Sequence, residues 1–309
     1  MTESLDATAY TVGWIAALPH EQAAAIAALE KEHKRPKNWT KPDTDKNTYF
    51  WGSIGSHNIV IACLPKGVYG NTSATVVGTS MLSSFSHVRV GLLVGIGAGV
   101  QETEPDIHLG DVVISSPGPK SPGVVQYDYG KAEDGGNFVQ TGVLNKPPMA
   151  LLSALSRLDS DAFLQRNRTG AFVGELSRKF PKFKCPVIQE KRNHGPSLFF
   201  GTIASGNEVV KDAERRSEIV KLAGPKTMCI EMEAAGLMDS FPCLVIRGIC
   251  DFADSHKNDQ WQNYAAAAAA AAAKDFLFVL DPQDVEDTKK AAEAIKGMSD
   301  WDTALMPIL

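Results

Sequence analysis

Three acidic residues towards the C-terminal end of the chain are the first candidates for chemistry. Glu231 and Glu233 flank Met232 in the run TMCIEMEAAG, and Asp251 directly follows the apolar run CLVIRGIC. The first run passes from apolar residues into small, helix-forming residues, and the second is typical of a buried strand. Carboxylates at the ends of buried strands are where open α/β enzymes keep their chemistry. The spacing therefore predicts two strand ends that carry acidic groups.

The segments around these residues alternate between strand-like and helix-like patterns. Strands are expected at residues 10–18, 49–53, 58–64, 88–94, 112–115 and 198–205, and helices at residues 19–29, 72–83, 147–158, 209–222 and 261–280. This alternation predicts a single α/β domain over residues 8–280, followed by a C-terminal extension over residues 281–309. A long functional loop is expected at residues 116–136, and a variable or mobile insertion at residues 166–195.

Composition excludes several classes of protein. With 44% hydrophobic and 22% charged residues, the chain resembles a soluble globular protein, and its net charge of −5 argues against nucleic-acid or anionic-membrane partners. The five cysteines form no CxxC motif, so we expect reduced thiols and no zinc site. The N-terminus lacks a signal-peptide pattern, and no apolar run reaches the roughly 18 residues of a membrane span. A cytoplasmic protein is expected.

A glycine cluster, GIGAG at residues 95–99, follows one of the predicted strands. It lacks the third glycine of a GxGxxG fingerprint and no crossover helix follows, so a dinucleotide cofactor is not expected. We interpret it instead as a tight turn in which Ile96 and Gly97 lie beside a ligand, because glycine permits close approach of a sugar or an anion.

Three blocks together resemble one family. They are WIAALPHE at residues 14–21, CIEMEAA at residues 229–235 and VIRGICD at residues 245–251. In this order they are similar to the purine nucleoside phosphorylase/nucleosidase superfamily, and within it to the 5′-methylthioadenosine/S-adenosylhomocysteine nucleosidases. The motifs ALPxE, GVYG and RGICD are also shared with fungal nucleosidase-like variants, some fused to NACHT or repeat modules. The resemblance implies a twisted mixed β-sheet, partly closed into a barrel and surrounded by helices, in a homodimer without metal or organic cofactor.

The resemblance also implies roles for individual residues. Asp251 matches the aspartate that protonates N7 of the purine, and Glu233 matches the glutamate that binds the ribose hydroxyls. Met232 matches the apolar residue against the ribose face, and Glu231 is expected beside the substrate. Glu21 matches the glutamate that binds the attacking water. Two alternatives stay open from the residues themselves: Glu231 and Glu21 are equally typical of carboxylates in the first turn of a helix.

Two departures from the family concern the substrate pocket. Ile96 stands where the nucleosidases usually carry a serine, and Val209, beside Asn207, replaces the aromatic residue that stacks on the purine. We expect Asn207 and Val209 to line the base pocket and a different aromatic side chain to supply the stack. The candidates for the stack are Phe200, Tyr127 and Tyr129. Arg247 is expected to tie its strand end to the region of Glu231.

The leading hypothesis is a nucleosidase that uses water to cleave purine ribonucleosides of the adenosine, guanosine or inosine type. A carboxylate at Glu21 repels phosphate, and the LPHEQ run offers no arginine to hold it. The alternative enzyme is a phosphorylase with Lys66 and His20 as an unconventional phosphate site. The alternative of another class is a catalytically silent signalling module of the same fold.

Overall fold

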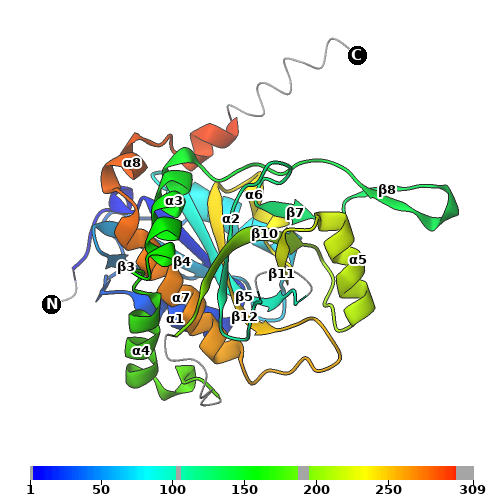
Figure 1. Cartoon of the computed structure of the whole chain (residues 1–309). Coiled ribbons are helices and arrows are strands. Elements are labelled where there is room, and N and C mark those ends of the chain that lie inside the picture. The colour runs from blue at the N-terminus through cyan, green and yellow to red at the C-terminus, as the bar shows by residue number, and fades with distance from the viewer. Residues whose placement is uncertain (1–2, 102–105, 187–194, 297–309) are drawn as a thin grey trace, which may run out of the picture.

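A ring of five β-strands forms the centre of the computed structural model, which describes residues 3–101, 106–186 and 195–296 (Figure 1). Around the ring the strands run in the order β5 (Val90–Gly99), β12 (Cys243–Asp251), β6 (Val112–Ser115), β10 (Leu198–Ser205) and β11 (Thr227–Glu231). The ring closes where β11 pairs with β5, with Cys229 opposite Gly99 and Ile230 opposite Ala98. The expected partly closed barrel is confirmed.

The sheet continues outward from β5 on the side away from β12. The added strands are β1 (Val12–Ala16), β4 (His57–Cys63), β3 (Tyr49–Ile54) and β2 (Lys31–Glu32). β1 is parallel to both β4 and β5, and β12 is parallel to β5, whereas β3 is antiparallel to β4. The carboxyl ends of β1, β5 and β12 therefore lie at one edge of a mixed sheet, as a site at strand ends requires.

Helices cover both faces of this sheet. The core on one face includes side chains from α1 (Pro19–Ala28), α3 (Met149–Phe163), α4 (Thr169–Lys179) and α7 (Gln262–Val279). The core on the other face includes side chains from α2 (Asn71–Ser84) and the short α6 (Ala235–Met238). Two further helices are α5 (Ala213–Ala223) and α8 (Pro282–Asp287). The domain boundary at residue 280 stays a prediction.

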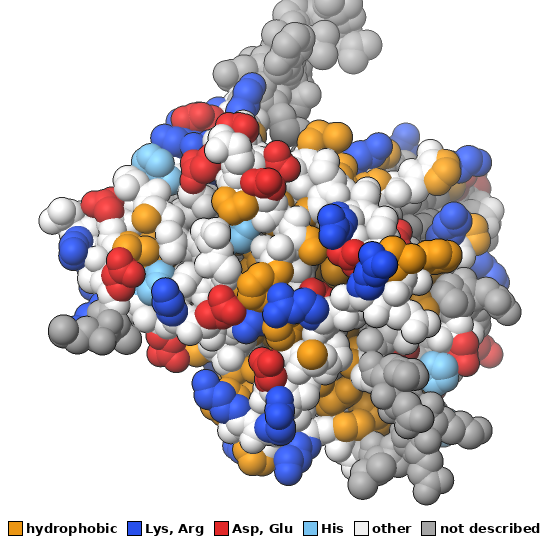
Figure 2. Space-filling model, turned by 60° about the vertical axis from the view of Figure 1, so that its left-hand side comes forward, with side chains coloured by type: hydrophobic (Ala, Val, Ile, Leu, Met, Phe, Trp, Pro, Cys, Tyr) orange, Lys and Arg blue, Asp and Glu red, His pale blue; other side chains and the backbone are white. Residues whose placement is uncertain are grey.

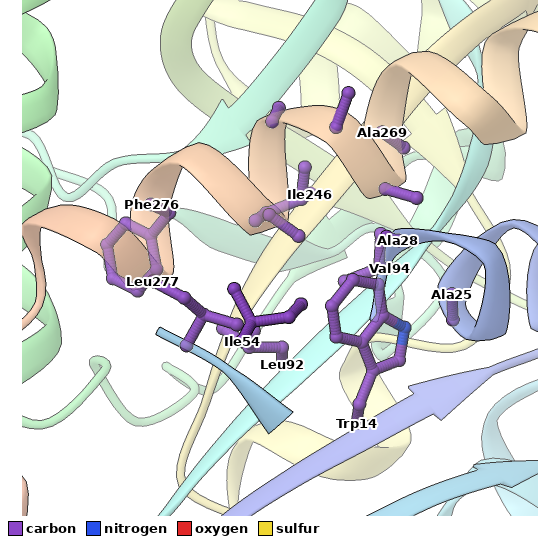
Figure 3. Close-up of a cluster of buried hydrophobic side chains, with 14 of the residues drawn as sticks. Trp14, Ala25, Ala28, Ile54, Leu92, Val94, Ile246, Ala269, Phe276 and Leu277 are labelled. Carbon is purple, nitrogen blue, oxygen red and sulfur yellow. The ribbon is translucent and has the colours of Figure 1, made fainter. Parts of the chain in front are cut away.

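Helix α7 lies unusually close to the sheet because its middle consists of alanine. All nine residues from Ala265 to Ala273 are buried, and the longer Phe276 and Leu277 fill the space near Ile54 and Leu92 (Figure 3). On β12, Gly248 faces this helix: a Cβ atom there would lie 1.9 Å from the carbonyl oxygen of Ala265. A glycine on the strand and alanines on the helix together allow this approach.

Three expectations about irregular segments are wrong in part. The predicted insertion at residues 166–195 contains α4, whose Phe172, Val173 and Leu176 are buried in the core; residues 187–194 lie outside the described chain. The predicted loop at residues 116–136 contains two short strands, β7 (Val124–Gln126) and β8 (Gly130–Ala132). β8 pairs with β9 (Phe138–Gln140) to form a hairpin. The helix expected from residue 209 begins at Ala213, because Asp212 accepts hydrogen bonds from the N–H groups of residues 214 and 215 and so caps it.

The face shown in Figure 2 carries lysine, arginine and acidic side chains interspersed with one another. The hairpin of β8 and β9 projects from the body of the molecule (Figure 1). Among the described residues, no helix is both long and apolar enough to cross a membrane.

Replacing Gly248 by alanine tests the contact between α7 and β12. The added methyl group has backbone on its near side, so the helix must move, and overpacking of this kind costs typically about 1–3 kcal/mol. Gly248→Ala should lower the midpoint of thermal unfolding by several degrees, measured by circular dichroism.

Gly174→Ala is the matched control. Gly174 lies inside α4, and nothing lies within 4 Å of the position of its added Cβ atom. In a helix interior, alanine is favoured over glycine by about 0.5–1 kcal/mol, so this variant should melt at the same or a higher temperature. Equal melting of wild type and Gly248→Ala would contradict the proposed close packing.

Candidate active site

A cavity of about 330 Å³ opens at the edge where the strand ends of β1, β5, β11 and β12 meet. Eight of the nine residues expected at the site line it: Glu21, Ile96, Gly97, Val209, Glu231, Met232, Glu233 and Asp251. A volume of this size suits a small organic ligand. The roles assigned to these residues stay predictions.

Asn207 lies behind the cavity instead of lining it. Its Oδ1 accepts a hydrogen bond from the N–H of Asn71 at 3.0 Å, and its own N–H donates to Asp128 at 2.8 Å. Asn207 therefore joins the loop after β10 to the start of α2. Its side chain is held against α2, and its expected role in substrate binding stays a prediction.

Glu21 is held by three backbone N–H groups. Its Oε2 accepts from Ala17 at 2.7 Å and from Leu18 at 2.8 Å, and its Oε1 accepts from Ile96 at 2.8 Å. The carboxylate thus joins the start of α1 to β5 and still lines the cavity, although its side chain is almost fully buried. Glu21 therefore both caps the helix and lines the cavity, and its role towards a ligand stays a prediction.

The glycines of GIGAG lie in strand β5 and not in a turn, so that expectation is wrong. Their function is to leave space. A Cβ atom on Gly95 would lie 2.4 Å from Oε1 of Glu21 and 2.5 Å from Nη1 of Arg247, and one on Gly97 would lie 2.4 Å from the sulfur of Cys229. Small residues on β5 therefore make room for charged side chains from the neighbouring segments.

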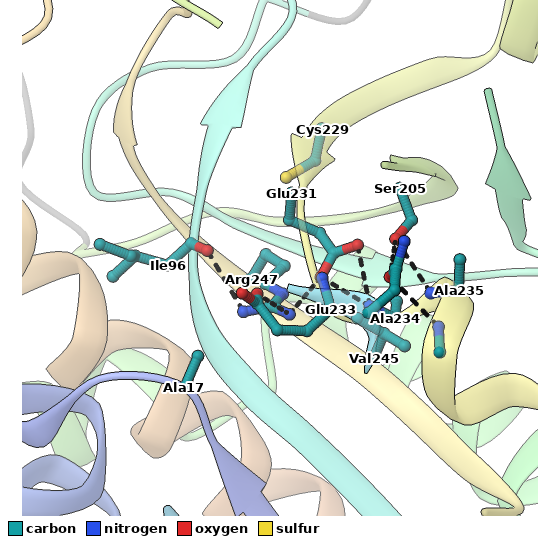
Figure 4. A network of polar contacts seen from close by, with 12 residues as sticks. Ala17, Ile96, Ser205, Cys229, Glu231, Glu233, Ala234, Ala235, Val245 and Arg247 are labelled. Atoms are coloured by element: carbon teal, nitrogen blue, oxygen red, sulfur yellow. Dashed lines mark hydrogen bonds and ion pairs between the residues drawn. The ribbon is translucent and has the colours of Figure 1, made fainter. Parts of the chain in front are cut away.

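Arg247 connects the two glutamates of the EME run. Its Nη2 donates to Oε2 of Glu231 and to Oε2 of Glu233, the latter at 3.3 Å, and its Nη1 donates to the carbonyl of Ile96 at 3.3 Å (Figure 4). Arg247 is fully buried, and its link to Glu231 is confirmed. Glu231 also accepts from the N–H groups of Glu233 and Ala234, so it fixes the backbone that carries Glu233.

Among the carboxyl groups that line the cavity, Glu233 has a clearly raised pKa. Burial raises its pKa to about 7, against the opposing influence of the Arg247 guanidinium; the charges of Glu231 and Glu21 add to the rise. The N–H of Gly70 donates to its Oε1 at 3.2 Å. Glu233 therefore changes charge near neutral pH.

Asp251 is held by contacts on both oxygens. Its Oδ1 accepts from the N–H of Ala253 at 2.9 Å, and its Oδ2 lies 3.1 Å from the sulfur of Cys250 and 3.2 Å from Nζ of Lys257. Burial and the adjacent carboxylate raise the pKa of the Cys250 thiol well above its usual range. The thiol is therefore protonated and donates to Asp251.

The aromatic residues expected to stack on a base lie elsewhere. Tyr127 is buried against Gly206, Tyr129 lines a separate cavity beside the β8–β9 hairpin, and Phe200 packs against the core under α7. All three expectations are wrong, because none of these rings lines the cavity. Tyr69, about half exposed, lines it instead.

Sequence reasoning missed several residues that line the cavity. They are Tyr69, Glu208, Lys257 and Gln262. The shared GVYG motif is a signal that could have found Tyr69. Lys257 carries no such signal, because it lies in an irregular loop whose path cannot be read from periodicity. Among the described residues, no cluster of three or more His, Cys, Asp or Glu side chains could hold a metal ion.

The Arg247 network generates a prediction about stability. Replacing Arg247 by methionine leaves Glu231 and Glu233 buried without their cation, and breaking a buried pair in this way costs about 3–5 kcal/mol. The urea concentration at the midpoint of unfolding should fall markedly. Arg215→Met is the control: Arg215 pairs with Glu208 and Glu218 near the surface of α5, where such bridges contribute about 0–1 kcal/mol. Similar losses in both variants would contradict the central role of Arg247.

Comparison with known proteins identifies relatives over most of the chain. Over 306 residues it is 42% identical to a nucleotide-binding leucine-rich repeat (NLR)-like protein of Hyaloscypha variabilis, a match that covers 91% of this chain and 30% of that protein. Over 276 residues it is 28% identical to ATP nucleosidase Cap17 of Escherichia coli, covering 85% of this chain and 50% of that protein. The chain thus spans half or less of these curated relatives.

Solved structures share the fold. The 5′-methylthioadenosine/S-adenosylhomocysteine nucleosidase of Neisseria meningitidis, in complex with methylthio-immucillin-A, matches with a TM-score of 0.60 at 20% identity, over 86% of this chain and 98% of that chain. The corresponding enzyme of Colwellia psychrerythraea, in complex with adenine, matches with a TM-score of 0.61 at 18% identity, over 88% and 96%. A family model described as the phosphorylase superfamily matches residues 11–279. With this match and the closed barrel, the chain belongs to the phosphorylase superfamily.

Proposed function

We propose that the chain is a purine nucleosidase, which hydrolyses the N-glycosidic bond of purine ribonucleosides to free base and ribose. Glu21, Glu233 and Asp251 come from three distant parts of the sequence and line one cavity. Glycosidic cleavage passes through an oxocarbenium-like transition state, so it needs a nucleophile, a grip on the sugar and a proton for the leaving group. The three carboxyl groups offer one group for each need.

The hydrogen bonds of Glu21 are the observation that carries this proposal. A carboxylate oxygen has two lone pairs. Oε2 uses both on Ala17 and Leu18, whereas Oε1 uses one on Ile96 and keeps one. That remaining lone pair suits acceptance of a proton from one water molecule, which is the task of a base that activates water.

The same contacts disfavour phosphate as the nucleophile. The backbone N–H groups that would bind an anion at the start of α1 already donate to Glu21. Among the described residues, the lysine that lines the cavity pairs with Asp251, and burial lowers the pKa of His20, which keeps its imidazole neutral at pH 7. Lys66, the other candidate for a phosphate site, does not line the cavity.

In the proposed reaction, the ribose hydroxyls donate to Glu233 and Asp251 transfers a proton to N7 of the purine. Positive charge that develops on the sugar strengthens its interaction with the ionised Glu233, so the stabilisation is greatest in the transition state. Arg247 and the N–H of Gly70 fix the two oxygens of Glu233. This positioning lowers the entropy loss on reaching the reactive geometry.

A purine nucleotide is the second candidate substrate. The 28% identity to an ATP nucleosidase supports it. Five carboxylates line the cavity, namely Glu21, Glu208, Glu231, Glu233 and Asp251, and they favour a substrate that carries less negative charge. We also propose a homodimer, from the family resemblance, and a cytoplasmic location, from the sequence pattern.

Release of base from a panel of substrates tests the proposal. The panel contains adenosine, guanosine, inosine, methylthioadenosine and ATP, each with and without phosphate, and chromatography separates base, ribose and ribose 1-phosphate. We expect free base and ribose from at least one nucleoside, at a rate independent of phosphate.

Asp251→Asn is the control for this assay, and loss of a general acid should lower kcat by roughly 10²–10⁴-fold. Strict dependence on phosphate would identify a phosphorylase. Absence of release from every substrate would favour the silent module, and release from ATP alone would favour the nucleotide.

The pH dependence of kcat/KM tests Glu233. With a pKa of about 7, the carboxyl group gains a proton as the pH falls below 7 and then holds the ribose hydroxyls less well. The wild type should therefore lose activity towards acid with a limb near pH 7. Glu233→Gln should lack this limb, and its plateau should be roughly 10- to 100-fold lower, as expected for loss of a hydrogen bond to a charged group.

Stability gives a second measure that needs no substrate. The folded-state pKa of Glu233 lies above the ordinary value of 4.5, so between these two values the folded chain binds more protons than the unfolded chain. The Glu233 contribution to the free energy of unfolding therefore falls as the pH rises through this window. Glu233→Gln should reduce that pH dependence; an unchanged acid limb and an unchanged stability profile would remove Glu233 from this role.

A further inference from the structure

Lys257 forms an ion pair with the proposed general acid. Its Nζ lies 3.2 Å from Oδ2 of Asp251, on the loop between β12 and α7. The side chain of Lys257 is 24% exposed, whereas that of Asp251 is 5% exposed. The lysine side chain is therefore partly exposed to solvent while its ammonium group contacts a buried carboxyl group.

This contact creates a conflict with a simple proton donor. An adjacent ammonium group favours the ionised form of a carboxyl group. An ionised Asp251 has no proton for the leaving purine. Either the pair must separate when substrate binds, or the proton must come from the lysine.

We propose that Lys257 is the proton source of a two-step relay, in which its ammonium group protonates Asp251 as Asp251 protonates the leaving purine. This inference rests on the proposed function. The Nζ–H bond of Lys257 breaks as an O–H bond forms on Oδ2 of Asp251, and the same oxygen passes this proton to N7 as the C1′–N9 bond breaks. Lys257 acts through Asp251 and is a positioning residue with respect to the substrate.

Protons are conserved over the complete reaction cycle. Water gives its hydroxide to C1′ and its proton to Glu21, while Lys257 becomes a neutral amine and the purine leaves protonated. The amine then regains a proton from solvent, to which the lysine side chain is partly exposed, and Glu21 releases one. A lysine amine and a purine anion have comparable affinity for a proton, so the transfer needs no large driving force.

Two further groups contact Asp251 besides Lys257. Cys250 donates its thiol hydrogen to Asp251 from β12, and the N–H of Ala253 holds the other oxygen. The remaining titratable side chains around the cavity and beneath it are Glu21, Tyr69, Glu208, Glu231, Glu233, His20, Cys229 and Arg247. Arg247 pairs with Glu231 and Glu233, which leaves Lys257 as the cation in contact with Asp251 among the contacts described.

Lys257→Arg and Lys257→Met distinguish a proton source from a simple counter-ion. Arginine keeps the positive charge and the ion pair but does not give up a proton in proteins. Methionine removes the charge, so Asp251 must carry its own proton. The measurement is kcat/KM between pH 5 and pH 10 on the best nucleoside of the panel. Lys221→Met, on the exposed surface of α5, is the control and should match the wild type.

The relay predicts that Lys257→Arg loses activity by roughly 10²-fold or more at neutral pH, the effect expected for loss of a proton donor. In Lys257→Met, the basic limb should move down by at least about one pH unit, because a carboxyl group releases its proton at lower pH than a lysine. Thermal melting of both variants confirms that they fold.

Near-normal activity of Lys257→Arg would overturn the relay, since charge alone would then suffice. A basic limb of Lys257→Met that moves upward would also overturn it, because the lysine would then be suppressing a proton that belongs to Asp251. An inactive wild type, by contrast, is a failure of the proposed function itself. The two failures are therefore distinguishable.

Discussion

The placement of one buried positive charge organises the site. Arg247 projects from β12 inside the closed ring and contacts β5 through Ile96 and β11 through Glu231. A buried guanidinium group requires anionic partners and hydrogen bonds, because its desolvation is otherwise prohibitive. The ring of strands brings those partners together, and the partners in turn fix the ring where β11 returns to β5.

This arrangement gives the carboxyl groups of the cavity different properties although they lie close together. Glu231 is held by Arg247 and by the backbone, whereas Glu233 shares the same cation and has a raised pKa. Glu21 depends on backbone N–H groups, and Asp251 depends on a thiol, an N–H and a lysine. Distinct surroundings are how neighbouring groups of one chemical type take separate tasks in one reaction.

The sequence alone predicted the features of this molecule that follow from local residue patterns. Buried strands, the carboxylates at their ends and the long alanine helix follow from periodicity and residue type. The contacts of Asn207 and the direction of Tyr127 do not, because they depend on how loops from distant parts of the chain meet. GIGAG shows the same limit: its glycines provide space for Glu21 and Arg247, and no local pattern specifies which side chains will occupy that space.

The alanine-rich centre of helix α7 also limits side-chain motion beneath the cavity. It begins beside the cavity at Gln262, and its buried centre consists of nine alanines. An alanine side chain loses essentially no rotamer freedom on folding, whereas a longer side chain loses up to about 2 kcal/mol. The support beneath the strand ends is therefore built from residues with no alternative rotamers. Any fluctuation of that support must therefore move the helix backbone, because the alanine side chains have no rotamers to exchange.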